Sequence, residues 1–357
     1  MKNVLQPKSN SAANPLNNAA SPSENSPSIA RPGELISVIR PAMATEFEVL
    51  MPADVDREAP EIALEALEWI RTLEGIFSVY RSDSDISKLN REAAERPVRV
   101  DPHLFKIVQQ AIAISDATGG AFDITAGPLV DAWGFTNRSG RKPSDEELAA
   151  ALQAVGYQNL ELDADQQTIR FKQPEMRINL GAIGKGYALD QAVAMLVTSG
   201  VENFLIHGGQ SSIVARGSRR PGEPGWPIAL SHPIRSHRKL GRVWLQNESL
   251  STSGSGKQFF HYRGQRLGHM IDPRTGWPGG DLLSLTLIAK VAAESDALAT
   301  GLFVDGMPQA TQFVEANPGL GIVGVAEVDR SSEVEVVAVA IADERWEPFQ
   351  ESSRDLN

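Results

Sequence analysis

Apolar and polar positions along the chain repeat with two periods, which predict where strands and helices lie. Alternating positions, or short apolar runs bounded by turn residues, predict strands at 35–39, 47–51, 160–162, 168–171, 176–180, 203–207, 226–230, 242–246, 321–325 and 334–341. Helical spacing predicts helices at 62–76, 102–118, 144–155, 187–197, 295–302 and 308–316. Strands outnumber helices without regular alternation, so the pattern favours an α/β fold of the mixed α+β kind over a doubly wound parallel sheet.

The chain divides into one domain and two tails. Residues 1–33 are rich in Ser, Asn, Pro and Ala, with almost no large apolar residue after Leu16, so we expect a disordered N-terminal tail. A single domain is predicted over residues 34–347, where no linker or internal repeat interrupts the pattern. Residues 348–357 are predicted to be a flexible C-terminal tail.

Composition narrows the classes of function. The 357 residues carry a formal net charge of -11 and no long run of Lys or Arg, which argues against non-specific binding to nucleic acid or anionic membranes. The absence of cysteine excludes thiol catalysis, disulfides and thiolate metal sites. No stretch approaches the roughly 18–20 apolar residues of a membrane span, and no secretory signal is evident, so a cytoplasmic location is the default and a periplasmic one stays open.

Candidate chemistry centres on a glycine-rich stretch, Asn179–Asp190, that joins a predicted strand to a predicted helix. Its three glycines let the backbone approach a ligand closely. The unpaired N–H groups at a helix start favour an anion, and Lys185 adds a positive charge, so a phosphate group would fit. The alternative is a glycine-rich helix start with a solvated lysine, because short glycine patterns arise by chance.

A second candidate lies on the predicted helix that holds Asp296 and Thr300. The two residues stand four positions apart and therefore share one helix face. Both side chains offer oxygen, so with a carbonyl from elsewhere they could hold a hard cation such as Mg²⁺. The alternative is an aspartate that caps the helix, with a threonine on the same side.

Two further stretches carry candidate site residues. His269–Gly276 places an imidazole, a carboxylate and a guanidinium around a turn, which suits catalysis. Gly119–Val130 is dense in small residues beside one aromatic residue and one carboxylate, which suits either a close ligand contact or a buried turn. The polar stretch Ser251–Lys257 lacks the full G-x-x-x-x-G-K-[ST] spacing, so it is not predicted to be a phosphate loop.

Taken together, these stretches resemble the ApbE family of FAD:protein FMN transferases, which move FMN from FAD to a Thr or Ser of a target protein. The matching stretches follow one another along the chain at 43–45, 78–80, 84–90, 119–130, 133–135, 180–190, 208–209, 251–254, 269–276 and 296–300. So many ordered matches make chance implausible. The resemblance implies a transferase with a single ApbE-like domain, built from a mixed, largely antiparallel sheet and flanking helices.

The resemblance also implies the residues of the site. The implied FAD contacts are Met43, Tyr80, Ala121, Phe122, Asp123, Asn179, Lys185 and Ile271. The implied Mg²⁺ ligands are the Ala182 carbonyl, Asp296 and Thr300. This set is sparse, so water and FAD phosphate oxygens should complete the six ligands that Mg²⁺ prefers. The implied partners are FAD, as substrate, and a target flavoprotein with an acceptor Thr or Ser, for example in an Asp-Gly-x-Thr-type segment.

The sequence departs from the family pattern at several positions. Ala44 stands where the family usually has Gly, Asn179 where it often has Asp, and Gln210 where Asn is common. Gly256 and Lys257 stand near the place of an acidic and aromatic pair, which leaves target-protein contacts there open. The family's usual export signal is also missing from the sequence.

We expect His269 to be the base that takes the proton of the acceptor hydroxyl, because an imidazole titrates near neutral pH. Asp272 or Arg274 would orient it, while Lys185 and Mg²⁺ neutralise the FAD pyrophosphate as AMP leaves. A structural hydrogen bond of His269 in a turn is the other interpretation. The alternative functions are a Mg²⁺-dependent FAD pyrophosphatase, which would use water and give FMN and AMP, and an FAD-binding protein without turnover.

Overall fold

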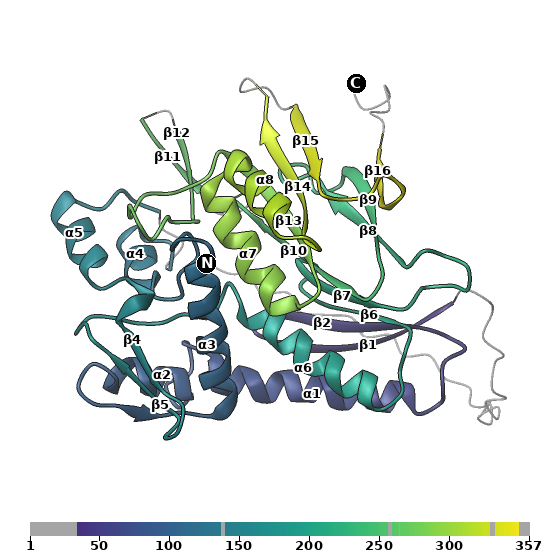
Figure 1. Ribbon diagram of the computed structural model, residues 1–357, viewed down its shortest axis with the longest axis horizontal. Coiled ribbons are helices and arrows are strands. Elements are labelled where there is room, and N and C mark those ends of the chain that lie inside the picture. Colours follow the sequence, from purple (N-terminus) through teal and green to yellow (C-terminus); the bar gives the residue numbers. More distant parts are fainter. Residues whose placement is uncertain (1–33, 137–139, 256–258, 264, 329–332, 350–357) are drawn as a thin grey trace, which may run out of the picture.

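An eight-stranded antiparallel sheet forms the centre of the computed structural model, which describes residues 34–136, 140–255, 259–263, 265–328 and 333–349 (Figure 1). Its strand order is β1-β2-β6-β7-β10-β13-β14-β15. The strands are β1 (Leu35–Ala42), β2 (Thr45–Pro52), β6 (Phe204–Gly208), β7 (Ser212–Arg216), β10 (Glu248–Gly254), β13 (Leu282–Ala289), β14 (Gly321–Glu327) and β15 (Val334–Val339). Every neighbouring pair is antiparallel, which confirms the predicted mixed α/β fold with a largely antiparallel sheet.

Helices cover one face of this sheet (Figure 1). They are α1 (Ala59–Phe77), α6 (Gly184–Thr198), α7 (Ala292–Asp305) and α8 (Met307–Ala316). Leu285 and Leu287 of β13 are fully buried in one cluster with Leu298 and Leu302 of α7. Successive strand residues point to opposite faces, so residues of β13 between these leucines face away from α7.

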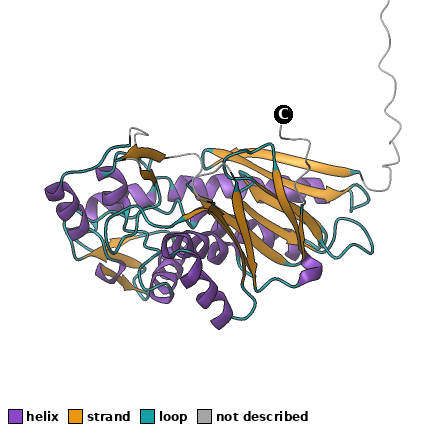
Figure 2. Ribbon diagram, turned by 90° about the horizontal axis from the view of Figure 1, so that it is seen from above, coloured by secondary structure: helices purple, strands orange, loops and turns teal. Residues whose placement is uncertain are grey.

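A smaller sheet covers part of the opposite face. It has the order β16-β9-β8, formed by β8 (Trp226–Ser231), β9 (Lys239–Leu245) and β16 (Trp346–Pro348). Trp226 and Ile228 of β8 are buried in one cluster with Ile213 of β7 and Ile288 of β13. The eight-stranded sheet is therefore packed on both faces, and Figure 2 shows its strands gathered at one end of the elongated molecule.

Short elements form a lobe at the other end, on the left of Figure 1. They are α2 (Asp85–Glu92), β3 (Val98–Arg99), α3 (Pro102–Ala117), α4 (Gly127–Ala132), α5 (Asp145–Gln153), the 3₁₀ helix η1 (Tyr157–Asn159), β4 (Leu160–Asp163), β5 (Thr168–Phe171), β11 (Phe259–Tyr262) and β12 (Gln265–Gly268). The 3₁₀ helix η2 (Asp343–Arg345) lies outside this lobe, beside β16. Leu129, Trp133, Leu148 and Ile271 form a separate buried cluster in this lobe. It joins α4 and α5 to the segment that follows β12.

Most of the predicted helices are confirmed with small changes at their ends. A capping box begins α5, because the Ser144 hydroxyl accepts from the Glu147 N–H at 3.2 Å and the Glu147 carboxylate accepts from the Ser144 N–H at 2.8 Å. No described helix is long and apolar enough to cross a membrane. The predicted tail at 1–33, residues 350–357 of the other tail, and Gly256 with Lys257 lie outside the described residues.

The strand predicted at 176–180 is wrong. Residues 176–180 belong to no strand: Asn90 accepts from the Ile178 N–H at 2.9 Å and donates to the Ile178 carbonyl at 3.0 Å, and the Asn179 N–H donates to the Ile124 carbonyl at 2.8 Å. Met176, Ile178 and Leu180 are buried in the main core. The alternating apolar residues of 176–180 therefore indicate that one side of the segment is buried, and they do not indicate pairing with another strand.

A tight two-residue turn links β1 to β2. The strands run to Ala42 and from Thr45, leaving Met43 and Ala44 as a two-residue turn. Both residues have left-handed backbone angles, with φ of 50° and 58°. This is the geometry of a hairpin turn that usually takes Gly or Asn, so Ala44 holds a conformation costly for a residue with a Cβ.

Candidate active site

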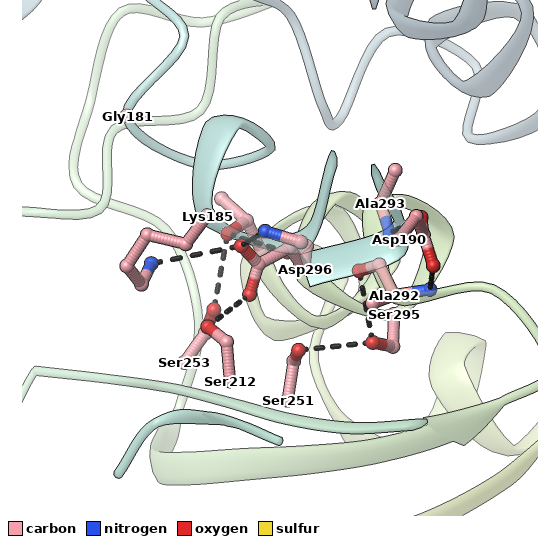
Figure 3. Close-up of polar contacts among 12 residues, drawn as sticks. Gly181, Lys185, Asp190, Ser212, Ser251, Ser253, Ala292, Ala293, Ser295 and Asp296 are labelled. Carbon is pink, nitrogen blue, oxygen red and sulfur yellow. Dashed lines mark hydrogen bonds and ion pairs between the residues drawn. The ribbon is translucent and has the colours of Figure 1, made fainter. Parts of the chain in front are cut away.

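Helices α6 and α7 meet at their N-terminal ends through two carboxylates (Figure 3). Asp190 of α6 accepts hydrogen bonds from the N–H groups of Ala292 and Ala293, the first residues of α7, at 2.8 Å each. Asp296 of α7 accepts one in return from the N–H of Gly186, in the first turn of α6, at 2.7 Å. Each helix start thus receives a carboxylate from the other helix, which satisfies N–H groups that have no partner within their own helix.

The Asp190 carboxyl is buried, and burial changes its pKa. Removal from water raises the pKa of this carboxyl to about 6, although its two N–H partners act in the opposite direction. The nearby charge of Asp296 raises the pKa further. Ionised Asp190 is therefore less favourable in the folded protein than in the unfolded chain.

Gly186 allows the two helices to approach this closely. A Cβ built at Gly186 would lie 2.1 Å from the carbonyl oxygen of Ala292 and 2.8 Å from the Cα of Ala293. Both are backbone atoms, so no side-chain rotation relieves the overlap. The third glycine of the predicted phosphate-binding stretch is thus required by helix packing.

The Asp296 carboxylate is the charged centre of the junction. Its Oδ1 accepts from the Ser212 hydroxyl at 2.6 Å, and its Oδ2 lies 3.6 Å from the Lys185 ammonium (Figure 3). Only 6% of the Asp296 side chain is exposed, against 25% for Lys185. A buried carboxylate held by two hydrogen-bond donors and a lysine keeps a fixed orientation.

Hydroxyl groups of β10 extend this polar centre. Ser253 and Thr300 lie within hydrogen-bond distance of each other at 3.0 Å, and so do Ser251 and Ser295 at 2.9 Å. The polar stretch rejected as a phosphate loop thus begins as a buried strand, β10, next to α7. The hydroxyls of Ser251 and Ser253 face the helix that carries Asp296.

A cavity of about 470 Å³ opens beside this junction. It is lined by most of the predicted site residues, namely Ala121, Phe122, Asp123, Asn179, Ala182, Lys185, His269, Ile271, Asp296 and Thr300. With residues 252–254 of β10, five separate parts of the sequence meet around one space. The predicted flavin, metal and proton-transfer groups share it.

Two side chains that line the cavity, Asp123 and Asn179, accept hydrogen bonds from backbone N–H groups of the protein. Asp123 accepts from the Thr125 N–H and hydroxyl, both at 2.7 Å, and from the Tyr157 N–H at 2.9 Å, while burial raises its pKa. Asn179 accepts from the Gly181 N–H at 2.8 Å. Both side chains thus shape the loops that line the cavity.

Four predicted residues do not line this cavity. Met43 lies in the β1–β2 turn, packed against the core, and Tyr80 has 84% of its surface exposed. Asp272 and Arg274 form a two-point ion pair, with N–O distances of 2.8 and 2.9 Å, and Arg274 also binds Asp305 at 2.8 Å. These two carboxylates raise the pKa of Arg274. The pair stabilises the turn after His269.

His269 occupies a distinct position at the edge of the cavity. It lines the 470 Å³ cavity and also a larger one on the other side. Its ring packs edge-on against Phe135, with the centroids 6.3 Å apart, and Phe135 in turn contacts Phe260 at 5.9 Å. An imidazole that packs against one aromatic ring between two cavities can reach groups that enter from either side.

The chemistry of the donor set fits a hard cation at Asp296. Within the described part of the chain there is no group of three or more His, Asp or Glu side chains that could hold a metal. Asp296, whose carboxylate is buried, borders the cavity together with Thr300 and Ala182, which carry a hydroxyl and a backbone carbonyl. Such oxygen donors suit Mg²⁺ when ligand phosphates and water supply the rest.

Sequence reasoning missed the residues that support this centre. It gave no role to Ser212, to Ser253, or to Asp190 as the carboxylate at the start of α7. Asp190 closes the glycine-rich stretch and Ser212 follows the Gly208–Gly209 pair, so both lie in or beside matched stretches. No local spacing indicates which distant backbone or carboxylate they bind.

Comparison with known proteins agrees with this geometry. The sequence model of the ApbE family matches residues 43–323. The chain is 31% identical over 294 residues to a protein of Vibrio cholerae named FAD:protein FMN transferase, covering 80% of this chain and 86% of that one. A protein of the same name from Haemophilus influenzae is 30% identical over 296 residues, covering 80% and 84%.

Solved structures show the same fold. The flavinyl transferase ApbE of Pseudomonas stutzeri, in its apo form, superposes with a TM-score of 0.77 at 28% identity, covering 87% of this chain and 96% of that one. The flavin transferase ApbE of Vibrio cholerae gives 0.74 at 28% identity, covering 86% and 97%. With this match over most of both its length and its fold, the chain belongs to the ApbE family.

Proposed function

We propose that this chain is an FAD:protein FMN transferase, which moves FMN from FAD to a Thr or Ser hydroxyl of a target protein and releases AMP. Membership of the ApbE family and the names of its relatives support this function. The observation that carries it here is the shared cavity, in which Lys185 and Asp296 at two helix starts face the same space as His269.

The reaction is a phosphoryl transfer with a protein hydroxyl as acceptor. The hydroxyl oxygen attacks the FMN-side phosphorus of FAD, a new P–O bond forms, and the bond to the AMP phosphate breaks. His269 takes the hydroxyl proton as the attack proceeds, since its imidazole borders the cavity. Lys185 binds the pyrophosphate and stabilises the negative charge that moves to AMP.

Mg²⁺ is proposed as the cofactor, held by Asp296, Thr300 and the Ala182 carbonyl. Bound there, it would neutralise pyrophosphate charge that a single lysine leaves uncompensated. Ser212 and Gly186 fix the Asp296 carboxylate, so the ligand is oriented before the metal arrives. The proposed FAD contacts along the wall are Ala121, Phe122, Asp123, Asn179 and Ile271, with Met43 and Tyr80 reached by the parts of FAD outside the cavity.

A test needs FAD, Mg²⁺ and a defined acceptor. We would use a small carrier protein with an Asp-Gly-Ala-Thr segment, and the same carrier with Ala in place of the Thr. Mass spectrometry should find FMN on the Thr carrier alone, with one AMP released for each FMN attached, and chelation of the metal should stop both. AMP released equally with either carrier would identify a hydrolase, and intact FAD would identify a binding protein.

A further inference from the structure

A second cavity of about 1080 Å³ lies on the face of the eight-stranded sheet opposite α7. Its floor includes Ile213 of β7, Leu250 of β10, Ser284 of β13 and Val325 of β14. Its walls come from β8, from the residues that link β8 to β9, and from Phe259 and Phe260 of β11. We call this cavity the acceptor groove.

The acceptor groove adjoins the candidate active site. Thr252, Gly254 and His269 line both cavities. A molecule in the groove therefore reaches the imidazole from the side opposite the proposed pyrophosphate site. This is the side from which an attacking hydroxyl must arrive if it is to displace AMP in line.

The size and lining of the groove suit an extended polypeptide. It crosses the four neighbouring strands β7, β10, β13 and β14, which at about 4.8 Å per strand gives roughly 14 Å. An extended segment of about four residues, at about 3.3 Å each, spans that length. Much of the lining is apolar, including Ile228 and Leu230 of β8, so part of the segment should be apolar too.

His232 adds a hydrogen-bond donor to the wall. It is 1% exposed, and its Nδ1 accepts from the N–H groups of Ile234 and Arg235 at 3.1 Å each, which places the ring proton on Nε2. Burial and the nearby arginines lower its pKa, so the ring stays neutral. Within the described residues Nε2 has no partner, and a carbonyl or carboxylate oxygen would supply one.

The rim of the groove is basic in an acidic protein. Residues 224–247 contain Arg235, Arg238, Lys239 and Arg242 but no Asp or Glu, whereas the whole chain has a net charge of -11. Arg242 is paired with Glu347 at 3.2 Å. Lys239 lines the groove, and its ammonium donates to the neutral Ser231 hydroxyl, so its charge is available to a ligand. A local positive patch attracts an acidic partner.

We propose that the acceptor groove binds the segment of the target protein that carries the acceptor hydroxyl, and that acidic residues flank this hydroxyl. The inference rests on the proposed transferase function, since it assigns the second substrate of that reaction to a place. The basic rim draws the acidic flanks, the apolar floor holds the segment, and His269 lies where the hydroxyl enters the other cavity.

The experiment measures binding and transfer separately. Two fluorescein-labelled peptides would share a central Asp-Gly-Ala-Thr, one flanked by Glu and the other by Lys, and fluorescence anisotropy would give their Kd for the FAD-loaded protein at low salt. We expect at least a tenfold preference for the Glu peptide. Arg235→Glu with Lys239→Glu should reverse the preference, and Arg235→Gln with Lys239→Gln should remove it, both without a change in FAD affinity.

A matched control changes the same number of charges elsewhere. Arg99→Glu with Arg170→Glu alters two exposed residues of the β3-β5-β4 sheet and should keep the wild-type preference. Equal Kd values for the two peptides, or a preference that survives both rim variants, would overturn the proposal. Loss of FAD affinity in the rim variants would assign the groove to FAD and overturn it too. Selective binding of the Glu peptide without FMN transfer would support the groove and count against the transferase.

Discussion

Replacement of Gly186 by alanine should disrupt the junction of α6 and α7. The added Cβ would lie 2.1 Å from the Ala292 carbonyl oxygen, whereas such contacts normally exceed about 3.2 Å, so the start of α7 must move by roughly 1 Å. That movement lengthens the Gly186–Asp296 hydrogen bond beyond its present 2.7 Å and weakens the two that Asp190 accepts. Hydrogen bonds to charged groups contribute about 1.5–3 kcal/mol each.

Helix propensity acts in the opposite direction. Alanine is favoured over glycine by about 1 kcal/mol inside a helix, so the loss of even two of the three bonds outweighs it. We expect Gly186→Ala to lower the free energy of unfolding by about 2–5 kcal/mol, measured by urea denaturation. Mg²⁺-dependent release of AMP from FAD should fall as well, because Asp296 loses a fixed orientation.

Gly75 in α1 provides the control. A Cβ built there meets no atom within 4 Å, so Gly75→Ala should leave stability unchanged or raise it by up to about 1 kcal/mol. Both variants make the same chemical change within a helix, and they differ in the space around the Cβ. Equal stability and equal Mg²⁺-dependent activity in the two variants would refute the reasoning.

Four further predictions concern the metal ligands Asp296 and Thr300, then Lys185, His269 and Asp190 in turn. Asp296→Ala should abolish Mg²⁺-dependent transfer while Thr300→Val only raises the Mg²⁺ required, because a carboxylate attracts a divalent cation more strongly than a hydroxyl does; a Mg²⁺ titration of AMP release tests the order. Lys185→Ala should weaken FAD affinity with little loss of thermal stability, as measured by flavin fluorescence and melting. His269→Asn should keep FAD bound but slow transfer by about 10²- to 10⁴-fold, and an unchanged rate would make His269 structural. The pKa of Asp190, raised to about 6 from 3.8, means that folding favours its protonated form. The contribution of Asp190 to folding stability is therefore complete below about pH 4 and is lost as the pH rises to about 6, by at most about 3 kcal/mol. Asp190→Asn should flatten the pH dependence of the free energy of unfolding in that window.

Periodicity predicted the elements that bury one face. Helices α1, α3 and α6 and the pairs β1–β2 and β4–β5 follow the predicted positions closely, because each has an apolar stripe or alternating side that packs on one neighbour. β10 gave no such signal. Its buried hydroxyls bond to other strands and to α7, for example Ser249 to the Ala289 carbonyl and Thr252 to Thr286. A polar strand in the core looks like a loop until its partners are known.

The sequence also predicted many of the residues that line the candidate site. Family motifs identified the residues that face the cavity, including Lys185, Asp296 and Thr300. The role of Asp272 and Arg274 in orienting His269 stays a prediction, because the structure shows only their ion pair and the contact of Arg274 with Asp305, and a turn with opposite charges looks the same whether it is structural or catalytic. The support of Asp296 by Ser212 is a contact across 84 positions, and local spacing carries no information about it.

The exchange of carboxylates between α6 and α7 has a consequence for cooperativity. Gly186 and Asp296 are separated by 110 positions, yet one hydrogen bond between them fixes the proposed metal ligand. The proposed metal site therefore cannot stay formed in a partly unfolded chain, because local opening of either helix start breaks this hydrogen bond. Ligand binding and local opening of the two helix starts are therefore coupled. A bound substrate raises the free energy needed to open either helix start.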